Sequence, residues 1–224
     1  MNPFKRVSSS LFNKLKKYTI PSHNTINKTG IVKSDHPKPG NGWIKGWVVN
    51  VQPKNIIIVC SHAVPTTVPP NNKVFVYDEY GNKIERTIIK VNRDPYKLDG
   101  VTESTRSDIA ICLVDKPFPD NIKGYNFSTN LYINNSPTIV IQKDGNPSDS
   151  NVITPKKRAW IKGVKRQPDE LLEFGDSGTP WFVWEKGEWR VVTHTYLGWH
   201  GEGPWYSHPY IFKDIKSRIE LLQK

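Results

Sequence analysis

The residues best suited to chemistry lie between positions 173 and 182. They read Glu-Phe-Gly-Asp-Ser-Gly-Thr-Pro-Trp-Phe, so Ser177 stands in a Gly-Asp-Ser-Gly core directly before an apolar run. A serine hydroxyl is a weak nucleophile and needs a base, a group that orients the base, and donors for an oxyanion. Glycine at position 175 permits a tight turn that aims the N–H groups of Gly175 and Ser177 at one point. The same residue types are common in surface turns, so the tetrapeptide alone leaves both interpretations open.

Two apolar runs elsewhere in the chain are placed to supply the base and its orienting group. Residues 56–60 form a β-branched run that predicts a buried strand, and His62 follows its end. Asp108 stands directly before a second apolar run at residues 109–114. A histidine can take the hydroxyl proton, and a carboxylate can orient the imidazole. Taken singly, His62 is better explained as an ordinary strand-end histidine and Asp108 as a strand-edge cap. Together with Ser177, the two residues predict a catalytic triad.

These three segments resemble the chymotrypsin-like serine proteases, in which the histidine ends one strand, the aspartate heads Asp-Ile-Ala, and the serine lies in Gly-Asp-Ser-Gly. The order His62, Asp108, Ser177 is that of the family, with intervals of 46 (108 − 62) and 69 (177 − 108) residues. The resemblance covers the chain from about residue 40 onward and implies a serine endopeptidase that needs no cofactor and no metal. In such enzymes the triad forms an acyl-enzyme, and the N–H groups of Gly175 and Ser177 would bind the oxyanion.

The elements that must position these residues are short apolar runs broken by glycine and proline. No helical run separates them, which predicts an all-β fold, a barrel or a sandwich. The resemblance implies two six-stranded antiparallel β-barrels with a short C-terminal helix, which we expect over residues 212–223 because Phe212, Ile215, Ile219 and Leu222 share one face. We expect a basic N-terminal arm at residues 1–35, an N-terminal barrel at 36–116, a linker at 117–124 and a C-terminal barrel with the helix at 125–224.

The basic charge of the chain is concentrated at its beginning. Of the 32 Lys and Arg residues, seven lie within residues 1–34, which contain no Asp or Glu. Phe4, Val7, Leu11 and Leu15 fall near helical spacing there. Four interpretations stay open: a solvated tail, a membrane-surface helix, an arm that binds nucleic acid, and an organelle presequence.

Cysteine content and hydropathy bear on the compartment. Cys60 and Cys112 are the two cysteines, and both lie in predicted buried strands. So few cysteines favour a reducing compartment or a virus-derived enzyme that works in one. No stretch reads as a secretory signal or as a bilayer-spanning helix. We therefore expect a soluble intracellular protein in the cytoplasm, with the cytoplasm of an infected host cell as one setting, and a protein or polyprotein as its substrate.

Three residues bear on specificity and one on activation. Leu171 stands six residues before Ser177, where trypsin-like members carry an acid, so a preference for Lys or Arg is not expected. Thr193 and His194 lie near the position where glutamate- and glutamine-specific relatives, including viral proteases and glutamyl endopeptidases, use a histidine as hydrogen-bond donor. The alternative is that His194 is a strand histidine with no substrate role. Asp176 corresponds to an aspartate that pairs with a new N-terminus in secreted members, but we expect no zymogen cleavage here.

A second class of function is compatible with the same residues. A protein with a protease fold can serve as a capsid or binding protein, with the basic arm on RNA or a membrane. Reaction of the serine with a fluorophosphonate probe separates the two classes.

Overall fold

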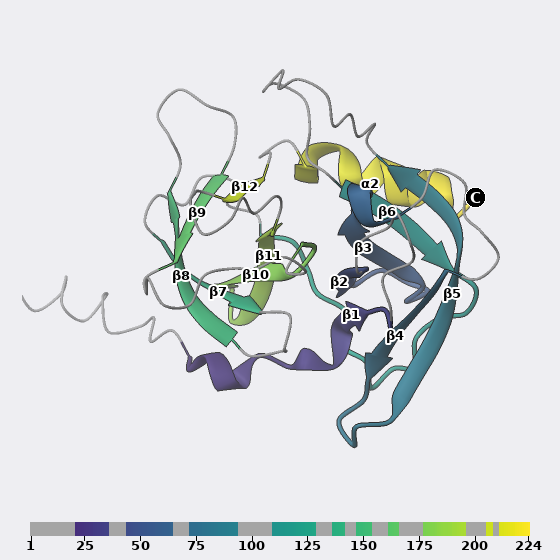
Figure 1. Cartoon of the computed structure of the whole chain (residues 1–224), viewed down its shortest axis with the longest axis horizontal. Coiled ribbons are helices and arrows are strands. Elements are labelled where there is room, and N and C mark those ends of the chain that lie inside the picture. The colour runs from purple at the N-terminus through teal and green to yellow at the C-terminus, as the bar shows by residue number, and fades with distance from the viewer. Residues whose placement is uncertain are drawn as a thin grey trace, which may run out of the picture.

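A computed structural model describes residues 21–35, 44–64, 72–93, 109–128, 136–141, 147–153, 161–165, 177–195, 205–207 and 211–224. These residues form a closed six-stranded barrel, a second six-stranded sheet and a C-terminal helix, α2 (Ile211–Leu222). Figure 1 shows the barrel and the second sheet side by side, with α2 lying across β5 and β6 of the barrel. The prediction of an all-β fold with two six-stranded units is therefore confirmed, and the helix begins one residue earlier than expected.

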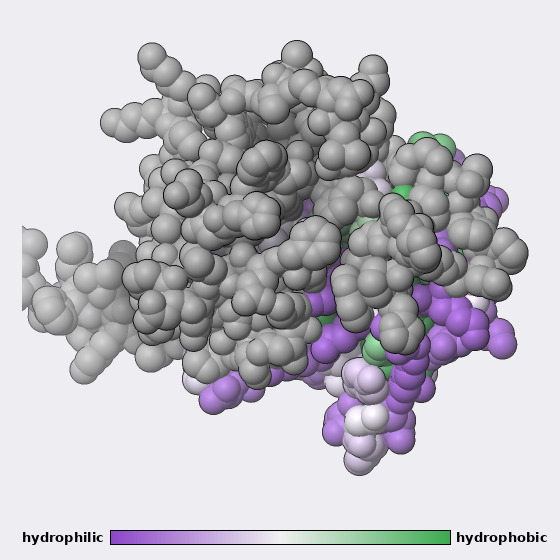
Figure 2. Space-filling model, in the orientation of Figure 1, coloured by the Kyte–Doolittle hydropathy of each residue, from purple (hydrophilic) through white to green (hydrophobic). Residues whose placement is uncertain are grey.

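The first barrel closes in the strand order β1-β2-β3-β6-β5-β4. Its strands are β1 (Ile31–Lys33), β2 (Lys45–Val48), β3 (Ile56–Cys60), β4 (Lys73–Tyr77), β5 (Lys83–Arg93) and β6 (Ile109–Val114). All of the neighbouring strands pair in antiparallel fashion. In Figure 2 the outward side of the β4–β5 hairpin is mostly hydrophilic.

The strands β3 and β6 are buried on both faces, which explains their uninterrupted apolar sequences. Successive side chains of a strand point to opposite faces. Ile56 and Ile58 of β3 join a core cluster that includes Phe182 and Ile219, whereas Ile57 and Val59 join the cluster inside the first barrel. An alternating pattern is absent because neither face meets water. The two strands therefore form the wall between the barrel interior and the rest of the molecule.

The second sheet has the strand order β11-β10-β7-β8-β9-β12. Its strands are β7 (Ser136–Ile141), β8 (Pro147–Ile153), β9 (Ile161–Lys165), β10 (Pro180–Glu185), β11 (Glu188–His194) and β12 (Trp205–Ser207). A two-residue turn at Lys186 and Gly187 joins β10 to β11, and both residues have positive φ, 55° and 78°. Such turns match the twist of an antiparallel hairpin. The register of the β10–β11 hairpin shifts once, between Trp181 and Phe182.

Residues 22–30, which we call the strap, run from the second sheet to the first barrel (Figure 1). At one end the Trp189 indole N–H donates to the Thr25 hydroxyl at 2.8 Å, and at the other the Lys123 N–H donates to the Thr29 hydroxyl at 2.9 Å. The strap leads directly into β1. Residues 31–33, which we expected within the arm at residues 1–35, therefore form a strand of the first barrel. A run of three residues is too short to show the periodicity of a strand in the sequence. Residues 1–20 lie outside the described residues.

The described chain also bears on two expectations about thiols and membranes. Cys60 and Cys112 are both thiols that are not joined in a disulfide, and both are fully buried. In the described part of the chain, no helix combines the length and the apolar character that crossing a bilayer requires.

Candidate active site

The pairing of β3 with β6 brings the sequence neighbours of His62 and Asp108 together. Cys60 is the pairing partner of Ile109. His62 lies in a short 3-10 helix, Ser61–Ala63, directly after β3, and its backbone is described whereas its side chain is not. Asp108 lies outside the described residues, immediately before Ile109. In an antiparallel pair the end of one strand lies beside the start of the other, so this register is what the proposed His–Asp contact requires.

The residues that follow Ser177 pack against this same end of β3. Ser177 is partly exposed, and Gly178 is buried with φ of 87°. A Cβ on residue 178 would lie 2.1 Å from the carbonyl oxygen of Lys45 and 3.4 Å from the backbone nitrogen of Cys60. Both the positive φ and the lack of space require glycine. The glycine after the serine thus permits the turn to approach the barrel.

Thr195 connects the segment after Ser177 with the end of β3. The Gly178 N–H donates to the carbonyl oxygen of Thr195 at 2.8 Å, and the Cys60 thiol donates to the same oxygen at 3.4 Å. The Thr195 N–H in turn donates to the carbonyl of Thr179 at 2.9 Å. We call residues 177–179, which contain the candidate nucleophile Ser177, the nucleophile turn. Cys60 lies two residues before His62, and Gly178 lies one residue after Ser177. The Thr195 carbonyl therefore links a neighbour of His62 to a neighbour of Ser177.

The hydroxyl of Thr195 adds two further contacts in the same region. It accepts a hydrogen bond from the Trp181 indole N–H at 3.0 Å and shares one with the Thr179 hydroxyl at 2.7 Å. Our sequence reasoning missed Thr195. The Lys186-Gly187 turn could have indicated Thr195. The turn sets Glu185 opposite Glu188, and a hairpin that continues in this register places residue 195 opposite residue 178. The register shift at Trp181 moves that partner to residue 179.

The structure describes the three predicted specificity residues to different extents. His194 is 1 % exposed, and its ring centroid lies 5.8 Å from that of Trp47 in β2. Of Thr193 the structure describes the backbone, which pairs with Trp181. Leu171 and Gly175 lie outside the described residues. The imidazole of His194 is thus held between the second sheet and the first barrel, and its role toward substrate stays a prediction.

Burial controls the titration of two groups in the core. Burial raises the pKa of the Cys112 thiol and of the Tyr125 hydroxyl above their ordinary values. Both groups therefore stay protonated in the folded protein well above neutral pH. Neither is a candidate nucleophile, since a thiolate rather than a thiol reacts. Among the side chains that the structure describes, no three of His, Cys, Asp and Glu are grouped to hold a metal ion.

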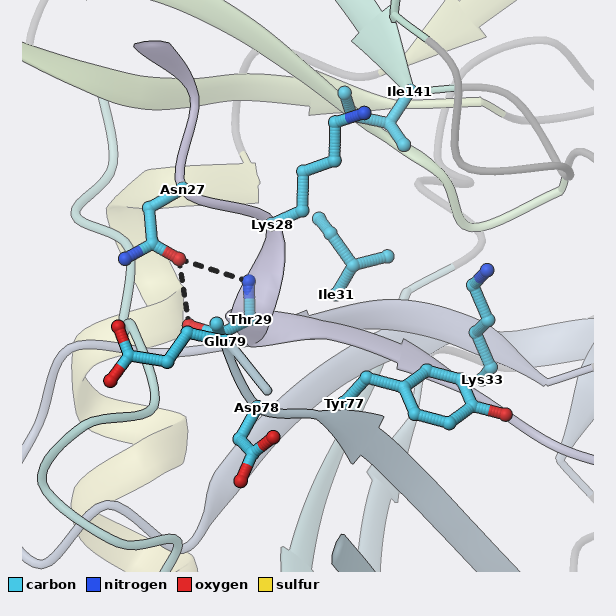
Figure 3. A pocket seen from close by; sticks show the side chains of 9 residues that line it. All are labelled: Asn27, Lys28, Thr29, Ile31, Lys33, Tyr77, Asp78, Glu79 and Ile141. Atoms are coloured by element: carbon cyan, nitrogen blue, oxygen red, sulfur yellow. Dashed lines mark hydrogen bonds between the residues drawn. The ribbon is translucent and has the colours of Figure 1, made fainter. Parts of the chain in front are cut away.

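A pocket of about 380 Å³ lies between the strap, β1, the turn after β4, and β7 (Figure 3). Lys28, Lys33, Asp78 and Glu79 contribute charged groups to it, and Ile31 and Ile141 contribute apolar surface. The Asn27 side-chain oxygen accepts hydrogen bonds from the backbone N–H and the hydroxyl of Thr29, which order the strap at this edge. None of its lining residues belongs to the nucleophile turn or to β3.

Comparison with known proteins places the fold. No protein-family model and no curated protein sequence matches the chain. The structure is similar to a scabies mite inactivated protease paralogue, with a TM-score of 0.65 and 13% identity over 86% of this chain and 92% of that one. It is also similar to a mutant of human heparin binding protein, with a TM-score of 0.63 and 11% identity over 86% of this chain and 91% of that one. The chain therefore has the chymotrypsin-like fold.

Proposed function

We propose that the chain is a serine endopeptidase with His62, Asp108 and Ser177 as its triad. The observation that carries the proposal is the convergence of Cys60, Ile109 and Gly178. Cys60 pairs with Ile109, and a Cβ on Gly178 would lie 3.4 Å from the Cys60 nitrogen. These residues are the described neighbours of the three candidates, drawn from three distant parts of the chain. If Gly-Asp-Ser-Gly were an ordinary surface turn, we would not expect it to pack against the end of β3.

Each member of the proposed triad has a defined part in acyl transfer. Ser177 attacks the scissile carbonyl, and His62 takes the hydroxyl proton and gives it to the leaving amine. Asp108 orients the imidazole and stabilises its cation, so an Asp108→Asn variant is expected to lose roughly 10⁴-fold in kcat. The N–H groups of Gly175 and Ser177 bind the oxyanion, each contributing about 3 kcal/mol to the transition state.

Labelling by a fluorophosphonate probe tests the proposal, because only an activated serine reacts at an appreciable rate. The purified full-length chain is expected to gain one covalent adduct on Ser177, identified by mass spectrometry of peptides. Ser177→Ala is the matched control, since it removes one oxygen from a partly exposed residue and leaves the fold intact. A wild-type chain that is folded but gains no adduct would disprove the proposed activity.

The preferred substrate is a protein or polyprotein cleaved after Glu or Gln. The support is a histidine, His194, at the end of β11 close to the nucleophile turn, together with the absence of an acid at Leu171. Profiling on a peptide library tests it with His194→Ala beside His194→Phe, which keeps a ring against Trp47 but removes the hydrogen-bond donor. Both variants are expected to lose the Glu or Gln preference. An unchanged preference in both would remove His194 from the substrate site.

The basic residues before the strap are proposed to hold the enzyme on RNA or an anionic membrane inside a host cell. Support comes from the excess of Lys and Arg without Asp or Glu in this part of the sequence. Because the strap belongs to the fold, the truncation that tests this removes residues 1–20 alone. Binding to a single-stranded RNA and to vesicles rich in phosphatidylserine is compared at low and high salt. Loss of salt-dependent binding on truncation supports the proposal, and unchanged binding contradicts it.

A binding protein without catalytic activity is the second candidate function. One observation favours it: of the two similar structures described above, one is an inactivated protease paralogue and the other is a mutant of a heparin binding protein. On this alternative the wild-type chain stays unlabelled by the probe, although it folds as described.

A further inference from the structure

We propose that Thr195 is a positioning residue for the reaction, which fixes the distance between the nucleophile turn and the end of β3. The inference rests on the proposed peptidase function. Thr195 follows β11 and belongs to neither the Gly-Asp-Ser-Gly segment nor the strands that lead to the other triad members. Its main chain and its side chain nevertheless both bond to the region between them, and each part has a separate effect.

The main-chain carbonyl of Thr195 sets the separation of two segments. It accepts from the Gly178 N–H at 2.8 Å and from the Cys60 thiol at 3.4 Å, so one oxygen atom is shared by the residue after Ser177 and a residue two before His62. The approach is already close, since a Cβ at residue 178 would lie 3.4 Å from the Cys60 nitrogen. A displacement of this carbonyl would therefore change the position of the serine relative to the histidine.

The hydroxyl of Thr195 fixes the position of its own carbonyl. An indole N–H can only donate, so the Thr195 oxygen accepts from Trp181 at 3.0 Å, and it is bonded to the Thr179 hydroxyl at 2.7 Å. The three side chains belong to residues that are at most 2 % exposed. Water cannot replace a lost bond at such a site without rearrangement, so the hydroxyl restrains residue 195 against β10. Valine has the same shape but lacks both hydrogen bonds.

Thr29 in the strap offers a matched control for the loss of a buried threonine hydroxyl. The Thr29 hydroxyl accepts a hydrogen bond from the Lys123 N–H at 2.9 Å and donates one to the Asn27 side-chain oxygen at 2.7 Å. The residue is 8 % exposed. Thr29→Val and Thr195→Val thus each remove two hydrogen bonds from a buried site. Neither partner of Thr29 belongs to the nucleophile turn or to β3. A purely structural role predicts equal consequences for the two variants.

The experiment compares Thr195→Val, Thr195→Ser and Thr29→Val in the full-length chain. Fluorophosphonate labelling rates and kcat and KM on a cleaved peptide are measured well below each melting temperature and normalised to the folded fraction. Misplacing a reacting group by 1 Å costs up to about 10²-fold, so we expect Thr195→Val to lose at least about 10-fold in kcat with KM little changed. Thr195→Ser keeps the hydroxyl and is expected to retain wild-type kcat. Thr29→Val is expected to melt earlier yet keep its kcat.

Two results would overturn the inference. One is a wild-type kcat in Thr195→Val, and the other is an equal loss of kcat in Thr29→Val. If Thr195→Val does not fold, Thr179→Val removes the same shared hydrogen bond from the other side and is expected to show the same loss.

Hydrogen exchange at the Gly178 amide separates this inference from the proposed function. Its N–H donates to the Thr195 carbonyl, so its protection should fall in Thr195→Val and not in Thr29→Val. This readout needs no activity. An unlabelled wild-type chain would therefore disprove the peptidase proposal while the exchange of Gly178 still decides whether Thr195 holds the turn, and equal protection in both variants would overturn the inference.

Discussion

The α-carbon of Gly178 lies directly against the main chain of Lys45, where a Cβ on residue 178 would come within 2.1 Å of the Lys45 carbonyl oxygen. The nucleophile turn and β2 are therefore in contact through their backbones. Gly178→Ala combines this overlap with the strain of a φ of 87°, so we expect a loss of at least about 3 kcal/mol in the free energy of unfolding. Urea denaturation and fluorophosphonate labelling of the folded variant measure the two consequences, and labelling is expected to be strongly reduced.

Gly187→Ala is the control for this substitution. Gly187 has a φ of 78°, close to that of Gly178, but no heavy atom lies within 4 Å of the Cβ position. It should cost about 1 kcal/mol, the strain alone, and leave the labelling rate unchanged. Equal losses in the two variants would show that contact with Lys45 is unimportant.

Lys54 is expected to anchor residues 119–122, which follow β6 and precede the second sheet. Its ammonium group donates to the carbonyls of Pro119, Asp120 and Ile122 at 3.3, 2.9 and 3.0 Å, and its side chain is 10% exposed. Lys54→Met keeps the apolar stem and removes the charged donor, so the free energy of unfolding should fall by about 2–4 kcal/mol. Equilibrium urea denaturation measures the change.

Lys73→Met is the comparison for Lys54, since it removes a lysine from an exposed ion pair. The Lys73 ammonium lies 2.5 Å from a Glu85 oxygen, but the two side chains are 59% and 39% exposed. Such pairs contribute about 0–1 kcal/mol. If Lys54→Met were no more destabilising than Lys73→Met, Lys54 would not be the anchor of residues 119–122.

The strap predicts that activation needs no cleavage before Ile31. Gly30 packs so closely against the segment around Lys123 that a Cβ on residue 30 would lie 1.9 Å from the Lys123 carbonyl oxygen. Ile31 pairs with Trp47 in β2. A chain that starts at Pro21 should label as fast as the full-length chain. A chain that starts at Ile31 loses the strap and should melt earlier without gaining activity. Activity confined to the form that starts at Ile31 would contradict this prediction.

Stability should fall at alkaline pH because of Cys112 and Tyr125. Burial raises both pKa values above the ordinary 9.0 and 10.0, so the folded chain keeps protons that the unfolded chain releases. Their stabilising contribution is complete below about pH 9 for Cys112 and below about pH 10 for Tyr125, and above that pH each contribution declines by roughly 1.4 kcal/mol per pH unit. Urea denaturation of wild type and Tyr125→Phe measures this, since phenylalanine cannot titrate. The stability difference between them should narrow above pH 10, and a constant difference would disprove the assignment.

The sequence predicted best what depends on local pattern. The runs in β3 and β6 are apolar throughout because both of their faces are buried, and their length and β-branched residues identified them as strands. Helix α2 was predicted to within one residue at each end because Ile215, Ile219 and Leu222 face the core. The strand β1 was missed because its three residues become a strand only by pairing with β2 and β4.

The same distinction applies to the candidate site. The motif around Ser177 and the strand positions of His62 and Asp108 are visible in the sequence, since each is a short pattern of residue types. The position of Thr195 is visible only in part: the Lys186-Gly187 turn indicates a pairing with the segment after Ser177, but the shift in the hairpin register that decides the exact partner has no sequence signal. Similarly, nothing in the sequence around His194 indicated that its ring would lie beside Trp47, a residue of β2 in the first barrel.

The two ends of the described chain each contact the unit formed by the other half of the sequence: the strap contacts the second sheet, and α2 contacts the first barrel. The strap bonds to β11 of the second sheet through Thr25 and Trp189, and α2 bonds to β5 of the first barrel through Arg218 and Asn92. Each half of the polypeptide is thus covered in part by a segment from the other half. During synthesis on the ribosome, the N-terminal half must wait with part of its core uncovered until the last twelve-residue helix has emerged. If the segment that connects the two halves were cleaved, the two fragments would remain associated. Either fragment produced alone would expose aggregation-prone apolar surface and depend on chaperones.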